Sequence, residues 1–566
     1  MGKIYRLDEH LANMIAAGEV VERPMAALKE LVENALDAKA SHIDVRLIDG
    51  GIERIEVSDD GEGMDTDDLR HAFERHSTSK IRSPLDLFAP KTLGFRGEAL
   101  PSIASVAKVN ATSSNGVEAN QIILQYGTEE TFRPYSRPQG TTIVVEGLFR
   151  KTPARLKHLK SVAYESSLCV DLIEKMALGH PEVAFKLTAN DEVLLNTTGR
   201  NDLLETLAMT YGNKLARVAH PFSAKDYDFE VNGLWVEPQE NRANNKGILV
   251  FLNSRLIRFY PLQKAVTEAY GAYLPPNRYP IAILHVRADA SLADVNVHPS
   301  KWEVKLAKEG QLCTLVSEAL LQALRTTFQA KPLSRSVFEP IPQQEALFNV
   351  VRGIDPLPLP PMDEVAETSA PWRHPTFPVL DVVGQLHGRY IVASDPDTVY
   401  FIDQHAAKER INFEKLINKL EQKISTRQEL LVPLTLTLKP SFIPKINDFL
   451  HNLAEIGLEA EWLGDQHLVV RSVPVWLKDG TQEAFIADLA ERFENEKTIN
   501  LASLRHAALA TTACHQSIRF NQQLTPQELR HIVDELSHCQ QPYHCPHGRP
   551  TLIKVGTHDL WKDFDR

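Results

Sequence analysis

The sequence predicts a multidomain α+β protein, and three successive stretches of the chain carry that prediction. Over the first 330 residues, apolar runs of strand length alternate with amphipathic helical patterns. From about Pro332 to Pro378 this periodicity disappears and ten prolines accumulate, which indicates a linker that is semi-extended in part. Strand and helix patterns resume at residues 382–394, and the chain that follows is long enough for one domain or two small subdomains.

The domain organisation follows from this pattern. The length of 566 residues suggests three or four domains at roughly 100–200 residues each, with a break near residues 200–210. The apolar runs of the first half are residues 42–48, 54–60, 141–149, 247–253 and 279–286. The expected parts are domains at 1–205, 206–331 and 379–566 and a flexible linker at 332–378, and the last domain is expected to contain a regulatory insert at about 427–505.

Composition excludes several classes of protein. Hydrophobic residues make up 43% and charged residues 24% of the chain, as in ordinary soluble globular proteins. No apolar run approaches the roughly 18–20 residues that span a bilayer, and the first 20 residues lack the apolar core of a signal peptide. We therefore expect a cytoplasmic protein with no membrane partner.

The five cysteines are Cys169, Cys313, Cys514, Cys539 and Cys545, too few and too scattered for a disulfide framework. Three of them fall within 32 residues of one another, close to several histidines, which favours a metal site in that region.

The net charge of −12 argues against a strongly basic nucleic-acid-binding protein, although a local basic patch is enough to bind DNA phosphates. One such patch lies at residues 150–160, where Arg155, Lys157 and Lys160 are candidate DNA contacts. A solvated helix face explains the same charges equally well.

The segment LKELVENALDAKA, residues 28–40, has the apolar spacing of a helix. Glu30 and Asn34 are spaced i and i+4, so they share a face of that helix about one turn apart. An asparagine oxygen suits a hydrated Mg²⁺, and a neighbouring glutamate can polarise a water molecule. A solvated polar stripe is the alternative interpretation.

Two glycine-rich segments add further features of a nucleotide site. In EVSDDGEGM a strand ends at Asp59 and enters a turn with Gly61 and Gly63, where the carboxylate can accept a hydrogen bond from an adenine amino group. In TLGFRGEALPSIASV, Gly94 and Gly97 precede a helix whose free N–H groups suit phosphates.

Each signal is weak alone, but ExxxN, DxGxGM, GFRGEAL and GTTIVV follow one another in that order within about 115 residues. This order resembles the GHKL ATPase superfamily, which includes gyrase B, Hsp90 and the histidine kinases. KELVENALDA, HSTSK and GFRGEALPSIASV resemble the MutL family of DNA mismatch repair proteins. The resemblance implies a Bergerat-type α/β sandwich followed by a ribosomal-S5-like second domain.

The resemblance also implies roles for single residues in the binding and hydrolysis of ATP with Mg²⁺. Glu30 would be the general base, Asn34 the Mg²⁺ ligand and Asp59 the residue that reads adenine, with residues 77–100 as the ATP lid. DVNVHPSKWEV is similar to the end of the family's second domain, where Lys301 would reach the γ-phosphate; a surface lysine is the alternative. The other implied nucleotide-binding residues are Gly61, Gly63, Thr78, Ser79, Lys80, Gly94, Phe95, Arg96, Gly97, Glu98 and Thr141.

A second constellation begins at DQHAAKERINFE, after the strand-like run DTVYFI. Asp403 stands at the strand-to-helix junction. His405 and Glu409 are i and i+4 on the helix that follows, so both can face one metal ion. Glu414 lies about 180° from His405 on an ideal helix, so we expect it to be structural or an ion-pair partner.

Cysteine and histidine candidates follow downstream. Cys514 lies in TACHQS, and in HCPHGRP the side chains of Cys545 and His547 would lie on the same side of an extended segment. Thiolate, imidazole and carboxylate together suit Zn²⁺ or Mn²⁺, and thiolate favours zinc. Cys539 matches no motif and is expected in a core.

These segments resemble the endonuclease-type C-terminal domain of the MutL family, whose DQHA-x2-E-x4-E motif the spacing matches. His515 departs from the pattern, since many members have arginine there. The resemblance implies a metal site that activates water and stabilises charge on a DNA phosphate. A structural zinc site without nicking is the alternative. The implied metal-site residues are Asp403, His405, Glu409, Cys514, Cys545 and His547.

Two short segments are similar to peptides that bind sliding clamps, in which a glutamine is anchored and apolar side chains enter a groove. QELLVP stands where the endonuclease-type family carries its clamp motif, and QEALF lies in the linker, where it could equally fold back on a domain. The residues concerned are Gln428, Leu431 and Pro433 in the first peptide, and Gln344, Leu347 and Phe348 in the second.

The resemblance as a whole implies an ATP-dependent conformational switch that couples mismatch recognition by MutS to strand incision, with latent nicking activity in a C-terminal dimerisation domain. The implied partners are DNA, MutS, the replicative sliding clamp and a second copy of the chain, on the nucleoid during repair. A non-nicking matchmaker that recruits a separate endonuclease is the alternative. A topoisomerase would need an acidic Toprim cluster and a cleavage tyrosine, and a histidine kinase a phospho-acceptor helix; the sequence has neither pattern.

Overall fold

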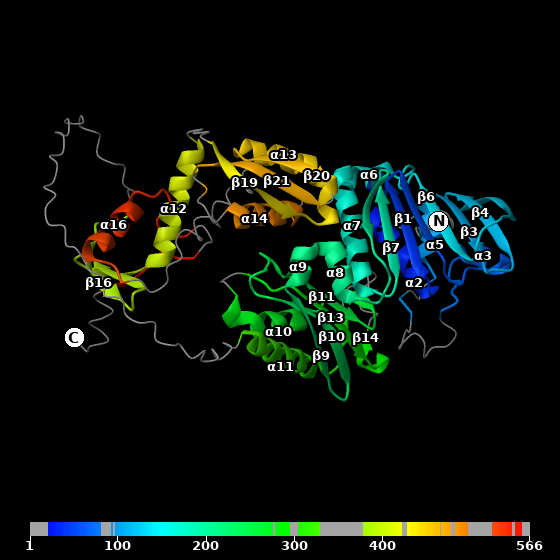
Figure 1. Ribbon diagram of the computed structural model, residues 1–566, viewed down its shortest axis with the longest axis horizontal. Helices are drawn as coiled ribbons and strands as arrows, with labels where there is room; N and C mark the ends of the chain where they lie inside the picture. The colour runs from blue at the N-terminus through cyan, green and yellow to red at the C-terminus, as the bar shows by residue number, and fades with distance from the viewer. Residues whose placement is uncertain are drawn as a thin grey trace, which may run out of the picture. The chain divides into compact units, whose positions relative to one another are not determined.

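The computed structural model divides the chain into two compact units (Figure 1). The first unit takes its described residues from 1–325, 427–475 and 486–499, and the second from 326–426, 476–485 and 500–566. The structure describes residues 21–80, 92–93, 97–274, 278–294, 304–328, 377–421, 427–464, 466–475, 477, 482–495, 523–545 and 549–556. The predicted site residues outside these ranges are Gly94, Phe95, Arg96, Lys301, Gln344, Leu347, Phe348, Cys514 and His547.

Eight strands of the first unit form one sheet. They are β1 (His42–Ile48), β2 (Arg54–Asp59), β3 (Lys108–Ser114), β4 (Ala119–Gln125), β5 (Thr128–Pro134), β6 (Gly140–Glu146), β7 (Ala184–Ala189) and β8 (Glu192–Asn196). Their order is β5-β4-β3-β6-β2-β1-β7-β8, with β1 and β7 parallel and the other neighbours antiparallel. Ile43, Val45 and Leu47 alternate along β1 and are buried, as expected for a sheet with one face on a core.

Helices complete this part of the first unit. They are α2 (Pro24–Asp37), α3 (Thr66–His71), α5 (Ala99–Val106), α6 (Pro153–His158) and α7 (Val162–Gly179), with a 3-10 turn η1 (Asp49–Gly51). Pro24 lies in the first turn of α2, where its missing N–H costs nothing. Leu28, Leu31, Val32 and Ala35 of α2 are buried in the same core as α7 and the sheet. This packing leaves the opposite face of α2 available for a site.

A five-stranded sheet follows, with the order β12-β11-β13-β10-β9. Its strands are β9 (Ala219–Lys225), β10 (Phe229–Val236), β11 (Ile248–Leu252), β12 (Arg255–Ile257) and β13 (Ala282–Ala288), and β14 (Ala293–Asp294) pairs separately with β15 (Lys305–Leu306). Its helices are α8 (Leu203–Tyr211), α9 (Asn213–Arg217), α10 (Tyr260–Tyr270) and α11 (Glu309–Phe328), with the turns η2 (Asn245–Gly247), η3 (Gly271–Tyr273) and η4 (Ala290–Leu292). Val250 belongs to one hydrophobic cluster while Leu249 and Phe251 belong to another. Both faces of β11 are therefore buried, which explains its uninterrupted apolar sequence.

The first unit also contains a three-stranded sheet from much later in the chain. Its elements are β19 (Arg427–Thr437), η5 (Pro440–Lys445), α13 (Ile446–Glu455), β20 (Glu459–Gly464), β21 (His467–Pro474) and the part of α14 (Gln482–Asn495) from residue 486 on, and the strand order is β19-β21-β20. η5 packs on α7, where the Ser441 N–H donates to Glu174 Oε1 at 2.8 Å. Asp488 forms a 2.9 Å ion pair with Arg278. Specific polar contacts therefore join this sheet to the two preceding ones.

The second unit has a four-stranded antiparallel sheet and two helices. The strands are β16 (Asp381–Leu386), β17 (Tyr390–Ser394), β18 (Thr398–Asp403) and β22 (Leu552–Gly556), in the order β16-β17-β18-β22, and the helices are α12 (Gln404–Glu421) and α16 (Pro526–Ser537). A capping box between Thr525 and Glu528 starts α16. Ile391, Ile402 and Cys539 lie in the hydrophobic core of the second unit, so the expectation of a core position for Cys539 is confirmed.

The prediction of an α+β multidomain fold is confirmed, and every apolar run that was expected to form a strand does so. The runs correspond to β1, β2, β6, β11, β13 and β18. The exact domain boundaries stay predictions. Among the residues with described positions, no helix is both long and apolar enough to cross a membrane.

Glu174 on α7 gives the first unit a pH-dependent stability. Burial raises the pKa of this carboxyl from 4.5 to about 8, against the opposing effects of Lys439 and the Ser441 N–H. Between these two values the folded chain holds a proton that the unfolded chain releases, so the free energy of unfolding falls as the pH rises through that window. Relative to Glu174→Gln, the wild-type chain is expected to lose about 2 kcal/mol between pH 6 and 8 in urea unfolding. Parallel pH profiles for the two chains would contradict the assignment.

Candidate nucleotide and metal sites

An open cavity of about 1530 Å³ lies against α2, the end of β2 and the segments at residues 76–80 and 97–101. This volume is large enough for a nucleoside triphosphate. Ten residues that the motifs indicated line the cavity: Glu30, Asn34, Asp59, Gly63, Thr78, Ser79, Lys80, Gly97, Glu98 and Thr141. Gly61 does not line the cavity, but it supports the lining residue Asp59, because the Gly61 N–H donates to Asp59 Oδ1 at 2.9 Å.

Asp59 is held in place by two backbone donors, one in the turn after β2 and one in β6. Its Oδ1 accepts from Gly61 N and, at 3.1 Å, from Thr141 N, which is 82 residues away in sequence. The two come together because β2 and β6 are neighbours in the sheet. Burial raises the pKa of Asp59, and these two N–H donors oppose that effect. A carboxylate oriented in this way can accept a hydrogen bond from an exocyclic amine.

The last turn of α2 carries a polar cluster that includes one residue not singled out from the sequence, Asp37. Lys80 Nζ lies 2.8 Å from Asn34 Oδ1 and 2.5 Å from Asp37 Oδ2. The Leu93 N–H donates to Asp37 Oδ1 at 2.8 Å. Asp37 lies at i+3 from Asn34, and this spacing within the same motif is the signal that could have identified it. Two side-chain oxygens side by side form a donor set that fits Mg²⁺.

Gly63 shows why the turn after β2 needs glycine. Its φ is +70°, and a Cβ built there would lie 1.9 Å from the Ser114 carbonyl oxygen. Backbone of another strand thus passes where a side chain would be. The close approach brings the β3 end next to the cavity wall.

Gly63→Ala is expected to destabilise the first unit by roughly 3 kcal/mol or more, because the clash adds to the cost of a positive φ. Gly116→Ala is the matched control, since Gly116 also has a positive φ of +88° but its nearest neighbour would be 3.5 Å from the new Cβ. The control should cost only about 1 kcal/mol in the same denaturation experiment. Equal losses for the two variants would show that the close contact is unimportant.

In the second unit, the end of β18 and the start of α12 bring three predicted residues together. Asp403 Oδ1 accepts from the N–H groups of His405 and Ala406 at 2.9 and 3.1 Å, which caps the first turn of α12. His405 Nε2 lies 3.1 Å from Glu409 Oε1, one turn further along. An imidazole and a nearly buried carboxylate are thus side by side, as the i, i+4 spacing indicated.

Arg410 connects this helix to the segment of Cys545. Its Nε donates to the His544 carbonyl oxygen at 2.6 Å, and Cys545 is buried. Glu414 accepts from the Gln540 N–H at 2.6 Å and lies 3.7 Å from Arg410, as expected for an ion-pair partner. No group of three histidine, cysteine or carboxylate side chains that could hold a metal is found among the described residues, which do not include Cys514 and His547.

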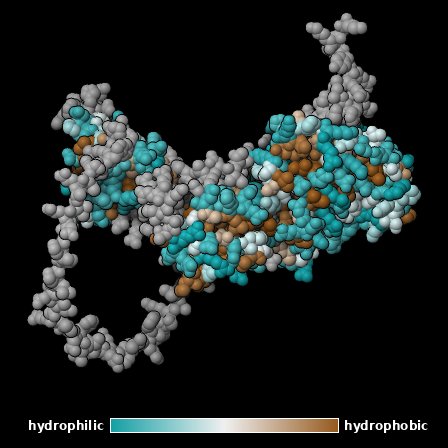
Figure 2. All heavy atoms as spheres, turned by 90° about the horizontal axis from the view of Figure 1, so that it is seen from above, coloured by the Kyte–Doolittle hydropathy of each residue, from teal (hydrophilic) through white to brown (hydrophobic). Residues whose placement is uncertain are grey.

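The first clamp-like peptide lies in a bulge of β19. Pairing with β21 continues to Glu429 and resumes at Leu434, so the segment between them leaves the regular register. Leu431 is fully exposed and Val432 is 74% exposed. Most of the described surface visible in Figure 2 is hydrophilic, with apolar patches between. An exposed apolar bulge beside Gln428 is a suitable peptide for a groove.

The basic patch includes α6, a helix with no buried residue. Lys157 is exposed there, and Arg155 and Lys160 are half-buried. Lys160 Nζ lies 4.4 Å from the ring centre of Tyr164, and Lys151 Nζ lies 3.7 Å from that of Tyr126. Part of the positive charge in this segment is therefore placed on aromatic rings.

Comparison with known families agrees with this arrangement. Residues 22–143 match the family of histidine kinase-, DNA gyrase B-, and HSP90-like ATPases, residues 207–325 match the DNA mismatch repair protein C-terminal domain, and residues 383–524 match the MutL C-terminal dimerisation domain. The fold around the cavity therefore defines the first part of the chain as a GHKL ATPase domain.

Full-length relatives extend the comparison to the whole chain. The DNA mismatch repair proteins MutL of Shouchella clausii and of an Exiguobacterium species are 36% and 39% identical, each over 100% of both chains. The chain belongs to the MutL family of DNA mismatch repair proteins. Among solved structures, the Aquifex aeolicus MutL ATPase domain complexed with ADP is 23% identical over 53% of this chain and 98% of that one, with a TM-score of 0.39.

Proposed function

We propose that this chain is an ATP-driven switch of mismatch repair whose second unit nicks DNA in a metal-dependent reaction. The observation that carries the first half is the convergence of ten motif residues on one cavity. The second half is supported by the adjacent His405 and Glu409 beside the helix-capping Asp403.

In the cavity, Glu30 accepts a proton from the attacking water, and Asp59 binds the adenine amino group. The N–H groups at Gly97 and the start of α5 bind phosphate oxygens. Asn34, with Asp37 beside it, would hold Mg²⁺, which neutralises phosphate charge when bound. Lys80 Nζ lies 2.8 Å from Asn34 Oδ1, so its ammonium group would contact the phosphates of a nucleotide bound beside Asn34.

In the second unit, His405, Glu409 and Cys545 would hold Zn²⁺ or Mn²⁺ together with Cys514 and His547. A bound ion would supply Lewis-acid stabilisation of a phosphate and lower the pKa of a water molecule. Asp403 adds a negative charge at the N-terminus of α12, where its Oδ2 lies 3.7 Å from Arg389 Nε. Arg410 holds the Cys545 segment against α12, the helix that carries His405 and Glu409.

The proposed partners are DNA, MutS, the sliding clamp and a second copy of the chain. The names of the matched family and of its relatives support mismatch repair and dimerisation. The exposed bulge at Leu431 and Val432 supports clamp binding through Gln428 and Pro433. Arg155, Lys157 and Lys160 are the proposed DNA contacts, and the site of action is the nucleoid in the cytoplasm.

The deciding experiment incubates the full chain with supercoiled plasmid, Mn²⁺, ATP and the sliding clamp, and follows conversion to open circles. Nicking that disappears with a chelator and returns with the metal supports the nuclease. If ATP is hydrolysed but no circles are nicked in any combination, the chain is a matchmaker that recruits a separate endonuclease. If ATP is neither bound nor hydrolysed, the switch itself is refuted.

A further inference from the structure

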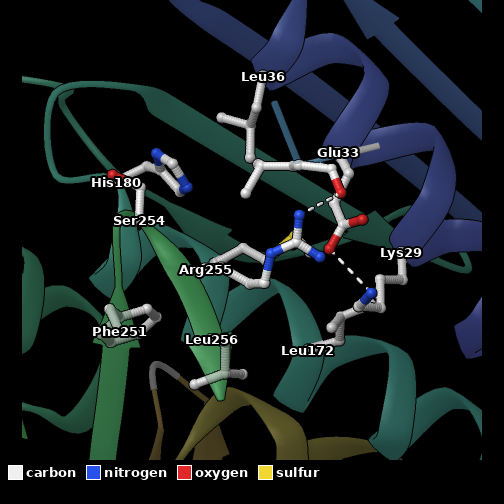
Figure 3. A pocket seen from close by; sticks show the side chains of 11 residues that line it. Lys29, Glu33, Leu36, Leu172, His180, Phe251, Ser254, Arg255 and Leu256 are labelled. Carbon is white, nitrogen blue, oxygen red and sulfur yellow. Dashed lines mark hydrogen bonds and ion pairs between the residues drawn. The ribbon is translucent and has the colours of Figure 1, made fainter. Parts of the chain in front are cut away.

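Arg255 joins the five-stranded sheet to the ATPase part of the first unit. It lies at the start of β12, is only 6% exposed, and lines a small pocket with Lys29 and Glu33 of α2. Figure 3 shows the guanidinium group beside the Glu33 carboxylate, which pairs with Lys29 at 2.9 Å. The pocket therefore places a β12 side chain directly on the helix that carries Glu30 and Asn34.

The guanidinium group of Arg255 donates hydrogen bonds to two backbone carbonyl groups. Its Nη2 donates to the Leu93 oxygen at 2.7 Å and to the Thr92 oxygen at 3.1 Å. A planar guanidinium group can satisfy both acceptors at once, and a lysine ammonium reproduces this geometry only partly. Because the site is buried, these charge-assisted bonds fix the position of residues 92–93 relative to β12.

The path continues from Leu93 to the predicted magnesium ligand. The Leu93 N–H donates to Asp37 Oδ1, Asp37 Oδ2 accepts from Lys80 Nζ at 2.5 Å, and Lys80 Nζ also donates to Asn34 Oδ1 at 2.8 Å. The Asp37 side chain is 7% exposed, so water competes little with these bonds. A continuous series of hydrogen bonds thus runs from Arg255 to Asn34.

We infer that Arg255 is a positioning residue of the ATPase, which sets the Asn34 carboxamide through Leu93, Asp37 and Lys80. A displacement of β12 moves Leu93, and with it the Asp37 carboxylate that accepts from the Leu93 N–H. Because Lys80 Nζ donates to both Asp37 and Asn34, the movement of Asp37 alters the hydrogen bond between Lys80 and the Asn34 carboxamide. The position of the five-stranded sheet is thereby coupled to the affinity for the magnesium–nucleotide complex. The inference rests on the proposed ATP-dependent function, and it assigns Arg255 no contact with nucleotide.

The test measures binding of a fluorescent, non-hydrolysable ATP analogue to the full chain with and without Mg²⁺. Arg255→Ala is expected to weaken binding by about 5- to 100-fold with Mg²⁺ and far less without it, a coupling of the usual size between linked sites. Arg255→Lys should restore part of the affinity. Arg258→Ala, which removes an exposed arginine three residues away, is the matched control and should bind as wild type does.

A double-mutant cycle with Asp37→Asn tests the path itself. The two substitutions should be non-additive, because each interrupts the same series of bonds. Additive losses, or equal losses with and without Mg²⁺, would overturn the inference. Thermal unfolding of each variant identifies a folding defect. If Arg255→Ala does not fold, the comparison of binding with and without Mg²⁺ is made with Arg255→Lys instead. Failure of the wild-type chain to bind the analogue would refute the proposed function instead, so the two failures are distinguishable.

Discussion

Glu30→Ala in the full chain is expected to lower ATP turnover at least 100-fold while ATP affinity stays within a few-fold of wild type. Glu30 lines the cavity on the same face of α2 as Asn34. General-base catalysis contributes roughly 10²–10⁴-fold to rates, which sets the size of the expected loss. Binding is retained because adenine and phosphate contacts come from Asp59, Gly97 and Thr141 rather than from the glutamate.

Steady-state phosphate release and equilibrium nucleotide binding are the two measurements required. Glu74→Ala is the control, because this carboxylate is exposed and does not line the cavity. Unchanged turnover in Glu30→Ala would remove the general-base assignment. A parallel loss of binding and turnover would assign Glu30 to ground-state binding instead.

Asp403→Asn is expected to reduce Mn²⁺-dependent nicking at least 100-fold without unfolding the second unit. The asparagine oxygen can still accept from the His405 and Ala406 N–H groups, so the cap of α12 is kept. The negative charge is lost, and with it the ability to stabilise a divalent ion. The substitution therefore separates the charge of Asp403 from its structural role.

Plasmid nicking and metal content are measured on the same preparations. Asp381→Asn serves as the control, since Asp381 is exposed at the far edge of the same sheet, at the start of β16. Equal nicking by wild type and Asp403→Asn would sink the active-site assignment. Nicking lost with normal metal content would place Asp403 in water activation rather than in metal binding.

The structural features that could be predicted from the sequence are those that depend only on residues close together in the chain. The spacing of Leu28, Leu31, Val32 and Ala35 was enough to identify α2 and its buried face, and the alternation in β1 was enough to identify a one-sided strand. The i, i+4 relation of His405 and Glu409 likewise requires only helical geometry. These features depend on residues within two turns or one strand.

The rest depends on contacts between distant parts of the chain. Asp59 meets Thr141 only because β6 pairs with β2, and Arg255 meets Leu93 across 162 positions of sequence. Asp37 looked like one more polar residue of a helix until Lys80 and Leu93 were placed beside it. No periodicity in the sequence distinguishes Ser441 as a partner of Glu174, 267 residues away.

The first unit is completed by a part of the chain that is synthesised late. α7 ends at Gly179, whereas β19 begins at Arg427 and η5 at Pro440. The Ser441 N–H that donates to Glu174 Oε1 is made 267 residues after its partner. During synthesis from the N-terminus, the strands and helices around the nucleotide cavity are therefore present well before the segment that packs on α7, and a chain shortened before β19 lacks that contact.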